Sequence, residues 1–86
     1  PGIPVEINKN YARKNQALIV FGKKFKHRKN YFNLSTKGSL KEAANNLYQI
    51  MRKIKKRKFS SIAVVKIPNK GIGCAINERL KKAANY

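Results

Sequence analysis

Residues 38–65 read "GSLKEAANNLYQIMRKIKKRKFSSIAVV", a pattern that predicts an amphipathic helix followed by a buried strand. Ser39 precedes Glu42 by three residues, the spacing of a capping box in which the hydroxyl accepts a helix N–H and the glutamate reaches back. Apolar residues then recur at helical spacing, which predicts a helix over about residues 40–55 with one face against a sheet. The residues of that face are Leu40, Ala43, Ala44, Leu47, Ile50 or Met51, and Ile54.

The apolar run 62–65 has the continuous hydrophobicity of an interior strand in a parallel sheet. Residues 17–21, "ALIVF", have the same character and predict a strand buried on both faces. Residues 3–7 alternate and include Pro4, which predicts an edge strand or a strand beginning. A short strand is also expected at residues 31–35.

The remaining segments complete an α/β arrangement. Residues 8–15 and 23–30 are polar or charged and predict connecting loops. After Pro68 a second helix is expected, and its inward face is predicted to be Ile72, Ile76, Leu80 and Ala83. The fold class is therefore α/β, a small Rossmann-like layer fold with a mostly parallel sheet of about four strands and two main helices. Residues 35–62 predict one right-handed β-α-β unit.

Length and composition limit the chain to one domain spanning residues 1–86. No apolar run approaches the roughly 20 residues that span a bilayer, so no membrane association is expected. The single cysteine, Cys74, forms no internal disulfide and is expected to pack as a small apolar residue. This usage favours a reducing, cytoplasmic setting. Because the chain starts at Pro1 rather than Met, it is expected to be a processed product or part of a longer protein.

The charge balance is strongly basic: 21 Lys and Arg against three acidic residues give a net charge of +18. Such a field favours encounter with nucleic acid or another polyanion. Coding bias offers a second explanation for the many Lys and Asn residues, but it does not account for the scarcity of acids. The basic clusters that would form an RNA-facing patch are Lys23, Lys24, Lys26, Arg28, Lys29, Arg52, Lys53, Lys55, Lys56, Arg57 and Lys58.

Aromatic residues flank both clusters, namely Phe25, Tyr31, Phe32 and Phe59. Aromatic side chains beside cations are used to hold single-stranded RNA. Three of these residues stand at predicted strand starts, however, where packing in the core is the alternative. The clusters therefore predict a solvated, attractive face that does not read bases.

Two helix starts are candidate anion sites because free N–H groups there attract negative charge. Residues 68–80, "PNKGIGCAINERL", match neither known phosphate motif: Ile76 stands where a dinucleotide fingerprint needs its third glycine, and the P-loop pattern is missing. A tight architectural turn is the alternative, and the same choice applies to the first helix start. The candidate residues are Ser35, Thr36, Lys37, Gly38, Ser39, Asn69, Lys70, Gly71 and Gly73.

Catalysis finds little support in the residue types. His27 is the only histidine, it has no acidic neighbour in sequence, and the three glutamates lie far apart. They form no predicted carboxylate pair, Cys/His pair or metal cluster. The chain alone is therefore expected to be no enzyme, with no cofactor, no metal and no catalytic residue.

Residues 31–84 resemble the C-terminal accessory domain of the long-form threonylcarbamoyl-AMP synthases. The shared features are the E-A-A-x-N-L helix start at residues 42–47, Pro68, the G-[LI]-G turn at 71–73, and the A-[IV]-N-[DE]-R-L helix at 75–80. Residues 16–25 also resemble the preceding strand of some members. The spacing agreement over some fifty residues is more specific than either motif alone.

The resemblance implies a Rossmann-like accessory unit that works with a YrdC-like catalytic domain, in cis or in trans. That catalytic domain makes threonylcarbamoyl-adenylate from ATP, threonine and bicarbonate, which feeds threonylcarbamoyladenosine formation in tRNA. No counterpart of the catalytic domain is recognised in this chain. Residues 8–16 are shorter than the helix often found there, which predicts a thinly covered sheet face and an apolar patch for a partner.

Three functions remain open at this stage. The first is an accessory and regulatory domain, inert in isolation. The second is a stand-alone basic RNA-binding module, with tRNA or another polyanion as partner. The third is a small-nucleotide sensor that uses the two helix starts.

Overall fold

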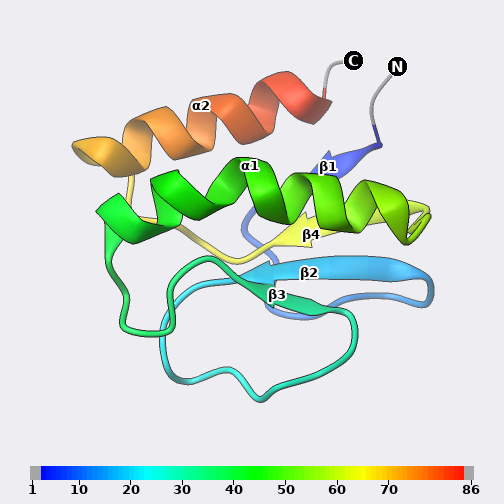
Figure 1. The fold of residues 1–86 in the computed structure, drawn as a ribbon. Helices are drawn as coiled ribbons and strands as arrows, with labels where there is room; N and C mark the ends of the chain where they lie inside the picture. Colours follow the sequence, from blue (N-terminus) through cyan, green and yellow to red (C-terminus); the bar gives the residue numbers. More distant parts are fainter. Residues whose placement is uncertain (1–2, 85–86) are drawn as a thin grey trace.

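The sheet has four parallel strands and lies beneath two helices (Figure 1). The computed structural model describes residues 3–84. The strands are β1 (Val5–Glu6), β2 (Gln16–Val20), β3 (Tyr31–Asn33) and β4 (Ser61–Val64), in the spatial order β1-β4-β2-β3. The helices are α1 (Leu40–Lys56) and α2 (Ile72–Ala84). This confirms the predicted small α/β fold.

Strand positions follow the hydrophobic patterns. β2 and β4 form the interior of the sheet and pair in register, with Leu18 opposite Ala63. β1 is an edge strand, as Pro4 predicted, and the Pro4 carbonyl accepts a hydrogen bond from the Ile62 N–H at 2.8 Å. Since a proline lacks only the donor, its acceptor still supports the sheet. β3 forms the opposite edge.

The two helices bury one stripe each, with a correction to both predicted faces. In α1, Ala43, Leu47, Ile50 and Ile54 are buried, whereas Ala44 lies exposed at the margin of the stripe. In α2, the expected inward residue Ile72 is 44% exposed. The inward face instead starts at Gly73 and continues through the buried Ile76 and Leu80, because the close approach of Gly73 to the preceding turn rotates Ile72 outward.

The second sheet face is covered by loops. Leu18, Val20, Ala63 and Val65 point to this face, and all four are buried. Their cover consists of the apolar side chains Ala12, Phe21, Phe25 and Tyr31. The prediction of an exposed apolar patch on this face is therefore wrong. A few apolar residues, most of them in otherwise polar loops, cover the sheet in place of the missing helix.

All three connections between strands have the same hand. The links from β1 to β2 and from β2 to β3 move across the sheet in one direction, and Ala12 and Phe25 place them on the loop-covered face. The return from β3 to β4 runs through α1 on the other face. Reversing both the direction and the face preserves the hand, as the strong preference among parallel connections requires.

Candidate functional site: two helix starts and a basic sheet edge

The start of α1 is held by a short chain of side-chain hydrogen bonds. The Ser39 hydroxyl accepts from the Glu42 N–H at 3.2 Å, which confirms Ser39 as the N-cap. The Ser39 N–H donates at 3.0 Å to the Ser35 hydroxyl, which donates at 2.5 Å to a Glu42 carboxylate oxygen. The predicted capping box is therefore half wrong: Glu42 reaches the Ser39 N–H through Ser35, because the buried serine occupies the intervening space.

This geometry places a carboxylate where an anion would bind. Glu42 lies in the first turn of α1, and Lys37 Nζ is 3.7 Å from its second carboxylate oxygen. The negative charge of Glu42 would repel an anion at this helix start. Lys37, the nearby cation, already lies beside the Glu42 carboxylate. Gly38 has φ +74 and its N–H donates to the Ser35 carbonyl, while Thr36 is exposed. The arrangement thus favours a cap over an anion site.

The start of α2 is a close backbone crossing. A Cβ on Gly73 would lie 1.8 Å from the Pro68 carbonyl oxygen and 3.0 Å from the Pro68 carbonyl carbon. The Gly73 N–H donates to the Lys70 carbonyl at 3.0 Å, and Gly71 has φ +57. These two glycines are required by the turn, because a side chain at either position is blocked or strained.

Asn77 fastens this turn from within α2. Its side-chain amide donates to the Ile67 carbonyl at 3.1 Å and to the Asn69 side-chain oxygen at 3.3 Å. Asn69 is therefore used internally, whereas Lys70 is exposed. No acidic residue lies in the first turn of α2, which is the more open of the two helix starts.

The two basic clusters meet at the end of α1. The Arg57 guanidinium donates at 2.8 Å to the carbonyl of Lys29, which joins the loop 21–30 to the helix. The same guanidinium lies over the rings of Phe32 and Phe59, at 5.7 Å and 5.4 Å from their centroids. These rings meet edge to face at 5.9 Å. Arg57, which the sequence placed among RNA-facing residues, thus also has a structural role.

The aromatic residues near the clusters belong largely to the fold. Phe25, Tyr31, Phe32 and Phe59 are half-buried and pack against the core. Arg28 covers the Tyr31 ring at 5.7 Å, and Lys24 lies 5.5 Å from the Phe25 centroid. Faces covered by the protein's own cations leave less area for bases to stack on. That the basic face does not read bases stays a prediction.

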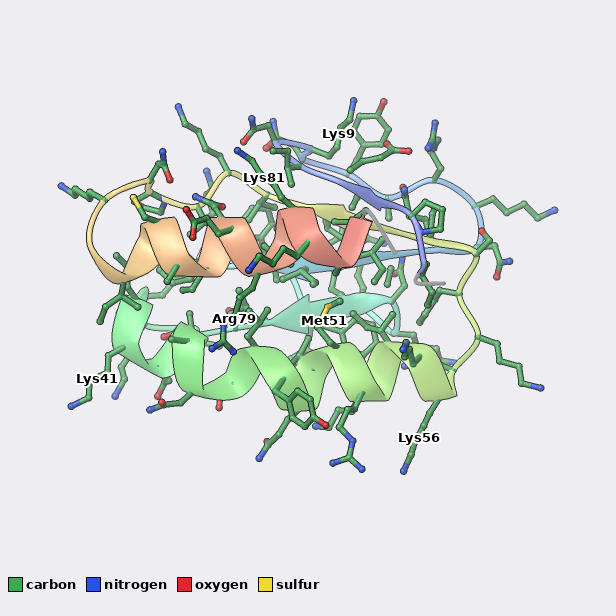
Figure 2. The ribbon with its side chains drawn as sticks, turned by 90° about the horizontal axis from the view of Figure 1, so that it is seen from above. Lys9, Lys41, Met51, Lys56, Arg79 and Lys81 are labelled. Carbon is green, nitrogen blue, oxygen red and sulfur yellow. The ribbon has the colours of Figure 1, made fainter. Side chains whose placement is uncertain are left out.

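The basic residues of α1 point to solvent. Figure 2 shows Lys41 and Lys56 extending outward from the two ends of α1, whereas Met51 and Arg79 lie between the two helices. Lys53, Lys55 and Lys56 occupy the last turn of α1, where the helix dipole favours cations. Arg52 is exposed and lies 5.6 Å from the ring centroid of Tyr48. Tyr48 is an aromatic residue that the sequence analysis did not associate with the basic clusters.

A pocket of about 350 Å³ lies at the outer edge of β3. It brings together groups that the sequence had assigned to separate sites: Lys26 from the loop cluster, Lys53 from the helix cluster and Thr36 from the first helix start. His27, to which the sequence analysis gave no site, lines the same pocket. In the sequence, this pocket was indicated only by a short strand with aromatic residues between two basic segments. That pattern does not reveal that both basic segments border the same strand.

Within residues 3–84, no three His, Cys, Asp or Glu side chains gather as they would around a metal ion. Neither helix in the described part of the chain has the length and apolar character that a membrane span requires. Cys74 is half-buried.

Comparison with known proteins gives one family. The family model described as "Threonylcarbamoyl-AMP synthase, C-terminal domain" matches residues 4–85. Searches of curated proteins and of solved structures found no significant match.

Proposed function

The chain belongs to the family of threonylcarbamoyl-AMP synthase C-terminal domains, and from this premise we propose that it is a non-catalytic accessory domain. Membership implies a role in the synthase family and in tRNA threonylcarbamoyladenosine modification. In the proposed role the domain works beside a YrdC-like catalytic domain, in cis or in trans, and regulates it. The proposed setting is the cytoplasm.

The family match over residues 4–85 carries this proposal, because it accounts for almost the whole folded unit. The local chemistry supports it. Glu42 takes part in the cap of α1, and the glycine pair at 71–73 sets α2 on the sheet. In this proposal, the residues that resemble a phosphate cradle in sequence serve the architecture of the domain. The domain is expected to act through its surfaces.

A reconstitution experiment tests the accessory role. The chain and a separately produced YrdC-like catalytic domain are assayed alone and mixed, with ATP, threonine and bicarbonate, by following pyrophosphate release. We expect no release from the chain alone and a changed rate when it is added to the catalytic domain. Turnover by the isolated chain would contradict the non-catalytic role, and an unchanged rate at saturating chain would contradict the regulatory role.

A second candidate function, binding of tRNA by the basic surface, rests on a specific observation. The net charge is +18, and the Arg57 hydrogen bond to Lys29 joins two basic clusters into one surface. Phosphate neutralisation by Lys and Arg makes affinity fall steeply with salt. This surface would attract a polyanion without selecting its sequence.

Salt titration of labelled tRNA binding separates the two kinds of attraction. Binding that persists at about 200 mM salt indicates a dedicated RNA site, whereas steep loss indicates contact with phosphates alone. The variant Lys55→Ala with Lys56→Ala removes charge from the last turn of α1. Its matched control, Lys81→Ala with Lys82→Ala, removes the same charge from the last turn of α2. Equal loss from both pairs would rule out a localised surface.

A further inference from the structure

We propose that the open edge of β3 is a docking site for an extended, acidic polypeptide segment, which adds to the sheet as a fifth strand. This inference does not depend on the accessory role proposed above. It rests on three features of one edge: outward-facing backbone groups, a pocket that crosses the edge, and cations on both sides of it.

The register of β3 leaves alternate backbone groups facing outward. The Leu18 N–H donates to the Asn30 carbonyl and the Leu34 N–H donates to the Val20 carbonyl, so Phe32 is the β3 residue that faces β2. The backbone groups of Tyr31 and Asn33 therefore point away from the sheet. The Tyr31 N–H is occupied by the Arg28 carbonyl at 3.1 Å.

Three groups remain for a partner. Among the residues that the structure describes, the Tyr31 carbonyl and the Asn33 N–H and carbonyl have no hydrogen-bond partner in the protein. Their alternation of acceptor and donor is the pattern that a neighbouring strand satisfies. Unpaired edges of this kind are templates for strand addition.

The pocket at β3 crosses the strand edge. Its lining includes Val20 and Tyr31, which point to the loop-covered face, and Phe32 and Ile50, which belong to the helix-covered face. Because Tyr31 and Phe32 face opposite sides of the sheet, a single pocket lined by both passes around β3. Figure 1 shows the elements that border the pocket, with α1 above β3 and the loop 21–30 beneath it. The volume of about 350 Å³ lies within the range of sites that hold ligands.

The charges around the edge select an acidic segment. Successive side chains of an added strand point to opposite faces. On one side they would meet Ile50 and Lys53 of α1, and on the other Phe25, Lys26 and His27 of the loop. Each side therefore offers an apolar surface beside a basic group. A segment in which acidic and apolar residues follow one another in pairs carries both kinds of side chain on each face, and therefore fits both walls.

Two other occupants fit less well. A second copy of this chain would bring together two surfaces of a molecule with a net charge of +18, and like charges repel. RNA could use the cations, but the Tyr31 ring is covered by Arg28 and the Phe32 ring by Arg57. RNA also lacks the regular amide spacing that the free groups of Tyr31 and Asn33 match.

Fluorescence anisotropy tests the proposal on the full chain at about 150 mM salt, where distant surface charges are screened. The probe is a labelled heptapeptide of sequence Glu-Glu-Val-Val-Glu-Glu-Val, in which each face of the strand carries both acidic and apolar side chains. A second peptide has the same sequence but carries an N-methyl group on every backbone amide, so its charge is unchanged and neither of its edges keeps a ladder donor. We expect the second peptide to bind about tenfold more weakly. Equal binding of the two peptides would overturn strand addition.

Variants of the chain locate the site. Lys26→Ala and Lys53→Ala are each expected to weaken binding about threefold, as partly exposed ion pairs do. Lys41→Ala removes the same charge from α1 outside the pocket and is the matched control. In amide NMR spectra, the Asn33 N–H is expected to shift and to become protected from exchange. Absence of peptide binding, equal effects of all three variants, or oligouridylate protecting Asn33 where the peptide does not, would each overturn the proposal.

Discussion

Substituting Gly73 by alanine tests whether the glycine turn is architectural. The added Cβ would lie 1.8 Å from the Pro68 carbonyl oxygen, and this contact has to lengthen to at least 3.0 Å. Because the obstacle is backbone, either the turn or the start of α2 must move. That movement disturbs the hydrogen bond from Asn77 to the Ile67 carbonyl and the packing of the helix on the sheet.

The expected cost can be estimated from these contacts. Overpacking costs about 1–3 kcal/mol, and a strained hydrogen bond adds about 1 kcal/mol. Alanine returns about 1 kcal/mol through its higher helix propensity. Together these terms lower the free energy of unfolding of Gly73→Ala by about 1–3 kcal/mol, which for a domain of this size lowers Tm by roughly 5–20 °C. A contact as short as 1.8 Å to backbone places the expected cost in the upper half of that range.

Urea unfolding followed by circular dichroism measures this change. Gly71→Ala is the matched control, because a Cβ at Gly71 meets nothing within 4 Å and only the left-handed φ of +57 opposes it. Its expected cost is about 1 kcal/mol. If the free energy of unfolding of Gly73→Ala equals or exceeds that of Gly71→Ala, the steric argument is refuted. A rise of several degrees in the melting temperature of the unsubstituted chain on adding ATP would instead show that the turn holds a nucleotide.

Substitutions at three further positions have expected outcomes in the same unfolding assay. Ser39→Ala removes the N-cap acceptor of the Glu42 N–H and should cost about 1 kcal/mol, so an unchanged midpoint would mean that the cap is dispensable. Lys58→Gly should raise stability by about 0.5–1 kcal/mol, since Lys58 follows the C-cap with φ 56, a conformation that glycine adopts without strain. Arg57→Ala should lower the free energy of unfolding by about 1–2 kcal/mol, because it removes the hydrogen bond to the Lys29 carbonyl and the ring contacts. Arg57→Lys should recover less than half of this loss, and full recovery by lysine would show that charge alone matters.

Local patterns predicted most of the fold because they report burial directly. Pro4 indicated the edge position of β1, and the uninterrupted apolar residues of β2 and β4 indicated the sheet interior. The glycine pair was predicted to form a tight turn, and the φ of Gly71 and the close approach of Gly73 to Pro68 are those of such a turn; that the turn binds no nucleotide stays a prediction. Strand order could not be predicted, because it depends on which connection crosses which face.

The candidate site was harder to predict because it depends on contacts between distant segments. The Ser35 relay was missed since a capping box specifies only residues within one helix turn, whereas Ser35 belongs to the segment that enters it. The meeting of Lys26 and Lys53 at one pocket depends on β3 being an edge strand with α1 packed beside it. The loop cover over Leu18 and Val20 was missed because single apolar residues in a charged loop have no periodicity.

The strand order also has a consequence for biosynthesis. β1 pairs only with β4, so Val5 has no strand to pair with until Ile62 has been synthesised. Of the four strands, only β2 and β3 can pair before β4 has left the ribosome, and until β4 emerges the apolar run of β2 lacks its neighbour on the other side. Chains dominated by such long-range strand pairing fold slowly, and they expose aggregation-prone apolar surface until folding is complete. A nascent chain stalled before β4 is therefore expected to depend on chaperones, and the sheet is expected to form as one event after residues 61–64 have left the ribosome.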